Sequence, residues 1–211
     1  NRNISTVIYN LIEGAIIVFL VLIIFLGNVR AGVIVASVIP LAMLFGFILM
    51  RVFGVSANLM SLGAIDFGIV VDGSIVILEG ILAHIYSKRL GGRVLTADEM
   101  CDEVEHGASK VVKSSTFAVL IILIVFFPIL TLSGIEGKYF TPMAQTLVFC
   151  IVGALLLSLT YVPMMCSLFL KRHISLKPSL ADRFFAFLTR YYKGTLRLVK
   201  RYTGALILSA F

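Results

Sequence analysis

The stretch of sequence that decides the fold is DFGIVVDGSIVILE, residues 66–79. It places three acidic residues, Asp66, Asp72 and Glu79, inside an apolar run that covers residues 59–85. A charged side chain near the centre of a bilayer costs about 2.5–3.5 kcal/mol on insertion scales. Three acids within one such run therefore indicate a segment that handles protons, ions or charged partners inside a membrane.

The composition predicts an all-α, polytopic membrane protein. The 211 residues are 60% hydrophobic and 14% charged, and the mean hydropathy is +1.06. A soluble domain of this length does not need so many apolar residues for its core. The chain begins with Asn1 and ends inside a new apolar run, so we expect it to be part of a longer protein.

Five stretches are long enough to cross a bilayer, which takes about 20 apolar residues in a helix. They are residues 6–26, 33–50, 59–85, 115–132 and 143–170. A sixth begins near Thr203 and continues to the last residue. The sequence thus predicts a helical bundle of about five complete spans and the start of another.

The basic residues predict how these spans are oriented. Most of the 18 lysines and arginines fall in the first, third and fifth connections between spans. Because short cytoplasmic loops carry the excess of Lys and Arg, this side is predicted to face the cytoplasm. The net charge of +7 is thereby attributed to topology and to contact with anionic lipid, and we expect no nucleic acid partner.

Two connections are predicted to form helices of their own. The sequence TADE, residues 96–99, has the pattern of a capping box, so a cytoplasmic helix is expected from there toward Ser115. Residues 179–202 combine an apolar stripe with basic side chains, which is typical of an amphipathic helix on a membrane surface. We therefore assign residues 171–202 to a cytoplasmic interfacial segment. The alternative is a surface helix of a soluble domain.

On an ideal helix the three acids fall on two faces. Asp72 and Glu79 differ by about 20° in azimuth and by about 10.5 Å along the axis, whereas Asp66 is turned by about 120° from Asp72. This spacing suits a proton relay in which each carboxylate is charged and neutral by turns. The alternative is that the acids line an aqueous cavity and have only a solvation role. No Lys, Arg or His lies deep in any predicted span, so we expect the basic partner in helices outside this chain.

Other candidate sites carry less weight. Cys101, Asp102, Glu105 and His106 lie close together in a predicted helix and resemble a metal-binding cluster, but a solvated helix face is the favoured interpretation. Glu13 is expected to serve an interfacial or helix-contact role and not proton transfer. No Ser/His/Asp set, phosphate-binding loop or nucleotide motif is visible, so we expect a secondary active transporter and not an enzyme.

The acidic helix closely resembles the fourth transmembrane helix of the heavy-metal-efflux pumps, a branch of the resistance-nodulation-division (RND) superfamily. The residues that carry this resemblance are GAIDFGIVVDG, residues 63–73, and VILE, residues 76–79. Supporting matches are FLGNVR (25–30), IPL (39–41) and NLMSLG (58–63). The resemblance covers essentially the whole chain. It identifies residues 1–170 as helices two to six of the N-terminal membrane half, residues 171–202 as the interfacial helix and residues 203–211 as the start of helix seven.

This resemblance implies a function as well as a fold. It implies a homotrimeric pump of the bacterial inner membrane that exchanges protons for metal cations without a cofactor and works with a periplasmic adaptor and an outer-membrane channel. Asp66, Asp72 and Glu79 would be its proton-relay acids. The second membrane half of the same chain and the periplasmic porter domains, which would hold the metal-binding site, are expected outside this segment.

The Asp-Phe-Gly form of the motif resembles the branch that exports zinc, cobalt, nickel or cadmium, and zinc is the favoured substrate. The copper and silver pumps usually lack an aspartate at the position of Asp66. Two residues depart from the family pattern: Ser74, where alanine is common, and Gly80, where asparagine is common. The alternative functions are a multidrug or lipid exporter of the same fold and a membrane scaffold or sensor that transports nothing.

Overall fold

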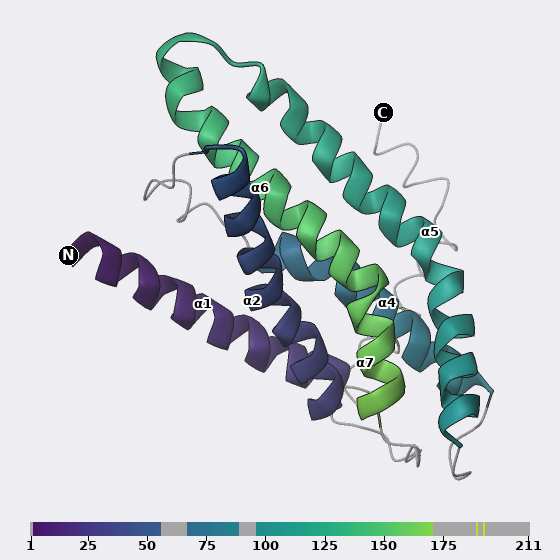
Figure 1. Cartoon of the computed structure of the whole chain (residues 1–211). Helices are drawn as coiled ribbons and strands as arrows, with labels where there is room; N and C mark the ends of the chain where they lie inside the picture. The colour runs from purple at the N-terminus through teal and green to yellow at the C-terminus, as the bar shows by residue number, and fades with distance from the viewer. Residues whose placement is uncertain (1, 56–66, 89–95, 171–188, 190–191, 193–211) are drawn as a thin grey trace, which may run out of the picture. The chain divides into compact units, whose positions relative to one another are not determined.

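The structure, a computed structural model, describes residues 2–55, 67–88, 96–170, 189 and 192. These residues form six α-helices and no strand (Figure 1), as expected for an all-α protein. The helices are α1 (Arg2–Leu26), α2 (Val29–Val52), α4 (Phe67–Ser87), α5 (Ala97–Leu130), α6 (Gly134–Leu159) and α7 (Tyr161–Phe169). Contacts divide the chain into two units, Asn1–Leu176 and Lys177–Phe211, and the description below concerns the first unit.

Four of these helices, α2, α4, α5 and α6, are long and apolar enough to cross a membrane. Helix α1 contains a shorter apolar segment, Ile12–Leu26. Each of the five predicted spans is helical over most of the residues that the structure describes, so the predicted helical bundle is confirmed. The predicted interfacial helix at residues 171–202 and the predicted span from residue 203 lie outside the described residues.

Helix α4, which carries the acidic motif, lies at the centre of the bundle. It packs against α1, α2, α5, α6 and α7. In its most apolar stretch 56% of the residues are buried, against 11% in that of α5. Because lipid tails are as apolar as aliphatic side chains, close packing and not exclusion of water holds such helices together. The exposed face of α4 therefore stands out from its otherwise close packing.

Two glycines bring the backbones of α4 and α5 into direct contact. A Cβ atom added at Gly107 would lie 2.8 Å from the Cα atom of Ile81, and one added at Gly80 would lie 2.5 Å from Cγ2 of Val111. Small residues at a helix crossing permit this close approach. At Gly80, Val111 occupies the space that a larger side chain would need.

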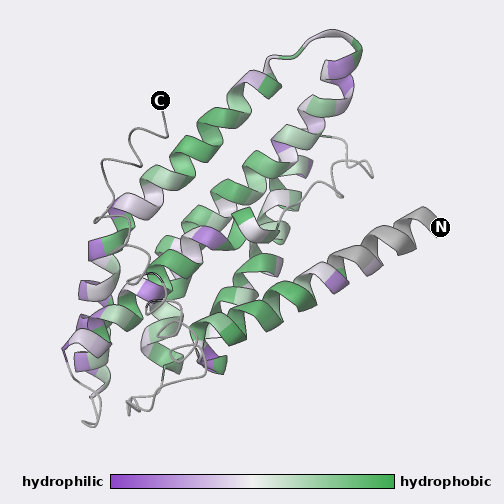
Figure 2. Ribbon diagram, turned by 180° about the vertical axis from the view of Figure 1, so that it is seen from behind, coloured by the Kyte–Doolittle hydropathy of each residue, from purple (hydrophilic) through white to green (hydrophobic). Residues whose placement is uncertain are grey.

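Helix α5 begins with the capping box that the sequence predicts. The hydroxyl oxygen of Thr96 accepts a hydrogen bond from the Glu99 backbone N–H (3.3 Å), and the Thr96 backbone N–H donates to the Glu99 carboxylate (2.9 Å). All Asp, Glu, His and Lys residues of α5 lie in its first part, residues 97–114, and the rest is apolar, as the purple and green parts of the ribbon show (Figure 2). The predicted cytoplasmic helix and the predicted span are thus one uninterrupted element.

The last predicted span, residues 143–170, is divided between two helices in the structure. Helix α6 begins earlier, at Gly134, and ends at Leu159, and α7 follows after Thr160. Pro163 has no N–H to donate to the Leu159 carbonyl oxygen, and its ring crowds that carbonyl group, so the helical hydrogen bonds are interrupted here. The Thr160 backbone N–H and the Thr160 hydroxyl both donate to the Leu156 carbonyl oxygen, at 3.1 and 2.7 Å, where α6 ends.

The contact between α4 and α5 can be tested with two alanine substitutions. Gly107→Ala forces a methyl group against the Ile81 backbone, whereas the methyl group of Gly73→Ala meets its neighbours at 3.5–3.6 Å. Both changes gain the same helix propensity, so we expect Gly107→Ala to be less stable than Gly73→Ala by about 1–3 kcal/mol. Thermal unfolding of the full-length protein in detergent measures this difference. Equal melting temperatures would contradict the close contact.

Candidate functional site

Helix α4 leaves one narrow face uncovered, and this face carries two of the predicted site residues. Between residues 72 and 86 the exposed positions are Asp72, Val76, Glu79, Ala83 and Tyr86. Their spacing of four, three, four and three residues keeps them on one side of a helix. We call this face the acid stripe. The structure thus brings Asp72 and Glu79 onto one face, as ideal helix geometry predicts, whereas Asp66 lies outside the described residues.

The acid stripe is an exposed, carboxylate-bearing face on a helix that is otherwise packed into the bundle. It carries two carboxylates, separated by Val76, and no Lys, Arg or His of its own. Burial of a carboxyl group favours its neutral form, and a nearby cation favours its charged form.

The buried side of α4 at the level of Asp72 is lined by hydroxyl groups. The Ser115 hydroxyl of α5 donates to the Gly73 carbonyl oxygen (3.4 Å), and Ser158 of α6 lies beside the same glycine. Ser74 is fully buried, and its Oγ has no hydrogen-bond partner among the described residues. An unsatisfied buried hydroxyl costs about 1–3 kcal/mol. The sequence signals this polar seam only through Ser74, which stands where the family usually has alanine.

A second group of ionisable residues joins α4 to α5 at the end that the charge pattern assigns to the cytoplasm. The side chain of His84 is only 5% exposed, and its Nε2 lies 2.9 Å from Oε2 of Glu103. Nζ of Lys88 lies 2.8 Å from the other carboxylate oxygen of Glu103, and Nζ of Lys110 lies 3.0 Å from Nδ1 of His84. We call these four residues the His84 cluster. Sequence reasoning did not find it, because the register between two helices decides which residues meet.

The basic neighbours of Glu103 lower its pKa below the ordinary value of 4.5. The largest cause is the hydrogen bond from Lys88. Partial burial acts in the opposite direction, while the charge of Lys88 and the contact with His84 lower the pKa further. Glu103 lies in the polar part of α5, before the apolar segment begins. It is therefore ionised at neutral pH and links α4 to α5 through His84 and Lys88.

The other candidate residues do not form a metal site. Cys101, Asp102, Glu105 and His106 are exposed on α5. Within the described residues no group of three or more His, Cys, Asp or Glu side chains is placed to hold a metal ion. These observations agree with the favoured interpretation of a solvated helix face. Glu13 is also exposed, on α1.

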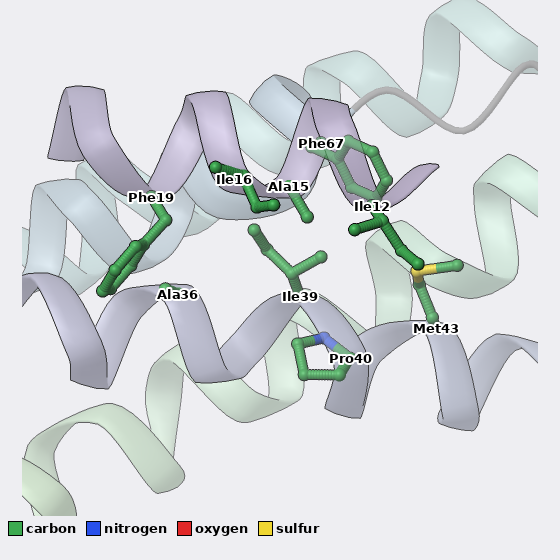
Figure 3. Close-up of a pocket in the computed structure, with 9 residues that line it drawn as sticks. All are labelled: Ile12, Ala15, Ile16, Phe19, Ala36, Ile39, Pro40, Met43 and Phe67. Atoms are coloured by element: carbon green, nitrogen blue, oxygen red, sulfur yellow. The ribbon is translucent and has the colours of Figure 1, made fainter. Parts of the chain in front are cut away.

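The structure also contains an apolar groove of about 410 Å³ between α1 and α2 (Figure 3). It is lined by Ile12, Ala15, Ile16 and Phe19 of α1, by Ala36, Ile39, Pro40 and Met43 of α2, and by Phe67 of α4. None of these side chains is ionisable.

The fold and the acid stripe define a polytopic, α-helical membrane protein whose central span carries carboxylates on one face. The whole chain, residues 1–211, matches the AcrB/AcrD/AcrF family. The chain belongs to this family, which is part of the RND superfamily, and the resemblance seen in the acidic motif is thereby confirmed.

Its relatives include proteins of metal resistance. The chain is 46% identical over 178 residues to the cobalt-zinc-cadmium resistance protein CzcA of Cupriavidus metallidurans. The matched region covers 84% of this chain and 17% of that protein. It is 44% identical over 173 residues to the nickel and cobalt resistance protein CnrA of the same organism. That match covers 82% of this chain and 16% of CnrA. The crystal structure of a heavy metal efflux pump matches with a TM-score of 0.67 and 36% identity, over 99% of this chain and 19% of that one. The chain thus spans less than a fifth of the length of these relatives.

The role of Glu103 can be tested through the pH dependence of stability. Its folded pKa is lowered, so the stability that it contributes is present above its unfolded pKa and is lost as the pH falls through the folded pKa. Because Lys88 is partly exposed, we expect Glu103→Gln to lower the free energy of unfolding at pH 7 by only about 0.5–1.5 kcal/mol. Melting curves at neutral and acid pH check this, and the difference from wild type should shrink on acidification. Glu105→Gln, at an exposed position of the same helix, is the control, and an equal effect of both changes would contradict the assignment.

Proposed function

We propose that this chain is part of a proton-driven exporter of divalent heavy-metal cations. The observation that carries the proposal is the acid stripe: Asp72 and Glu79 lie on the one uncovered face of the most deeply packed helix. An ionisable residue inside a membrane span is expensive and usually marks an ion or proton pathway. Two of them on the same face, at different depths, suit stepwise movement of protons across the bilayer.

The acid stripe works by exchanging charge with its surroundings. When a cation or water faces a carboxylate, the charged form is favoured, and when apolar groups cover it, the neutral form is favoured. Asp72 and Glu79 are about 10.5 Å apart along the helix, too far for direct transfer, so a proton passes between them through water or through movement of the covering helices. Asp66 is proposed as the third acid of this relay, on a different face. A proton that enters from the outside and leaves to the cytoplasm drives one step of the pump.

The substrate is proposed to be a divalent metal cation, with zinc first and cobalt, nickel or cadmium as further candidates. The names of CzcA and CnrA, at 46% and 44% identity, support this class. Less similar relatives include the swarming motility protein SwrC of Bacillus subtilis, at 30% identity. The metal is substrate and not cofactor, and its binding site is proposed to lie in periplasmic porter domains outside this chain. The energy comes from the proton gradient, without any catalytic reaction on the substrate.

The assembly is proposed to be a homotrimer in the bacterial inner membrane that works with a periplasmic adaptor and an outer-membrane channel. The second membrane half of the same full-length chain is proposed to cover the acid stripe. A multidrug or lipid exporter of the same fold is the second candidate. In that case, loss of the gene would leave the sensitivity of cells to metals unchanged. A scaffold or sensor is the third, and it differs in requiring no proton movement.

Substitution of Asp72 distinguishes transport from a scaffold. Removal of the charge eases insertion into the bilayer, so full-length Asp72→Asn is expected to fold and assemble like wild type. Loss of a proton-transfer group should lower proton-coupled zinc transport in vesicles on the order of 100-fold or more. Glu13→Gln, which removes an exposed carboxylate of α1, is the control and should transport normally. Undiminished transport by Asp72→Asn would overturn the relay, and misassembly of Asp72→Asn alone would favour the scaffold.

Asp66 and Glu79 are expected to be needed for transport in different ways. On an ideal helix Asp66 points about 120° away from Asp72, whereas Glu79 shares the face of Asp72. The two acids thus meet different neighbours, and Asp66→Asn and Glu79→Gln should change the pH profile of transport differently. Measurement of transport rate against pH in vesicles tests this. Wild-type profiles for both variants would reduce the relay to Asp72 alone.

A further inference from the structure

The His84 cluster contains a buried imidazole between a carboxylate and an ammonium group. His84 Nε2 lies 2.9 Å from Glu103 Oε2, and His84 Nδ1 lies 3.0 Å from Lys110 Nζ. The Nε2 contact has the distance of an ion pair without the alignment of a hydrogen bond. The attraction to Glu103 therefore depends on the charge of His84 more than on the direction of an N–H bond.

The two neighbours favour opposite charge states of the imidazole. Glu103 is attracted to a protonated ring. Lys110 can donate a hydrogen bond to Nδ1 only while that nitrogen carries no proton, because an ammonium group has donors and no acceptor. When His84 takes up a proton, its Nδ1–H faces the three N–H donors of Lys110. Lys110 is exposed, so it can move into solvent, while Glu103 and Lys88 keep their contact.

We propose that His84 is a proton-binding site at the cytoplasmic end of α4, and that its protonation slows transport by releasing Lys110 and strengthening the attraction between His84 and Glu103, which tightens the contact of α4 with α5. The effect on transport rests on the proposed function. Proton binding at His84 does not, because it depends only on the His84 cluster. Such a site would slow a proton-importing pump when the cytoplasm is already acid.

The position of the cluster connects it mechanically to the acid stripe. His84 and Glu79 belong to the same continuous helix. At Gly107 a Cβ atom would lie 3.2 Å from Cβ of His84 and 2.8 Å from Cα of Ile81, so α5 touches α4 at the residue that titrates. A change in the contact between His84 and Lys110 is therefore a change in how α4 rests on α5. A proton that binds one arrangement better than the other shifts the balance between them.

The other ionisable groups on the helices around His84 are exposed, distant or engaged elsewhere. On α5, His106 has its ring centroid 6.5 Å from that of His84 and is exposed, as is Lys113. Helix α7 carries no ionised side chain, and the charged residues of α6, Glu136 and Lys138, lie in its first turns. On α2, the Arg30 guanidinium donates to the Phe169 carbonyl oxygen (3.1 Å). Within the described residues only Glu103 and Lys110 touch the imidazole with charged atoms.

The experiment measures zinc transport by the full-length protein in vesicles while the pH on the cytoplasmic side is varied. The outer pH is fixed, and a potassium diffusion potential keeps the total proton-motive force constant. Wild-type transport is expected to fall severalfold as the cytoplasmic-side pH is lowered through the range in which imidazole titrates, between about pH 8 and 5.5. His84→Gln keeps a donor to Glu103 but cannot titrate, so its rate should change less than twofold over the same range.

Two further variants separate the titration of His84 from a structural effect. Lys110→Gln removes the ammonium group and leaves the imidazole, so the pH profile should keep its fall but its midpoint should differ from that of the wild type. His106→Gln removes the exposed histidine nearby and should leave the wild-type profile unchanged. A profile that His84→Gln does not flatten, or that His106→Gln flattens equally, would overturn the proposal.

A second readout does not require transport. Nuclear magnetic resonance of the full-length protein with isotope-labelled histidine should show an imidazole signal that changes with pH, is absent in His84→Gln and is altered in Lys110→Gln. The absence of a titrating His84 signal would remove the proton-binding site. If wild-type vesicles show no proton-coupled transport at all, the proposed function and the control of rate both fall, and the resonance titration alone then decides whether His84 binds a proton.

Discussion

The contact between the backbones of α4 and α5 at Gly107 sets the register on which the rest of this structure depends. Two helices that touch at Gly107 and Ile81 must also bring Glu103 to His84 and Ser115 to Gly73. In this register Asp72 and Glu79 are among the exposed positions of α4. Packing of small residues thus decides which side chains of α4 are buried against α5.

Packing residues and ionisable residues of α4 lie on different faces of the helix and at different positions along it. Its buried face is apolar except for the hydroxyl seam near Ser74, and its uncovered face carries the carboxylates. At its end the buried face becomes ionisable, with His84 held against α5. A helix in lipid satisfies its own backbone groups, so it can change side-chain chemistry from face to face without losing its shape. This allows proton handling and close packing to exist on one element.

Much of this arrangement follows from the sequence, because it depends on patterns within one helix. The spans are predicted from the length of their apolar runs, the start of α5 from the residues TADE, and the common face of Asp72 and Glu79 from their seven-residue spacing. The break at Thr160 is harder to predict, because the apolar run continues through it and only Pro163 marks it. The pairing of His84 with Glu103 is not visible in the sequence at all, because it depends on how two helices are set against each other.

Helix α5 runs without a break from the capping box at Thr96 to Leu130. At 1.5 Å per residue its 34 residues measure about 51 Å, whereas the hydrocarbon core of a bilayer is about 30 Å thick. The helix is therefore longer than the bilayer core is thick, and its polar first part extends beyond its apolar segment. A tilt of about 5° would displace one tip relative to the other by about 4 Å over this length. A change of contacts in the polar part of α5 that tilted the helix would therefore also move its apolar end.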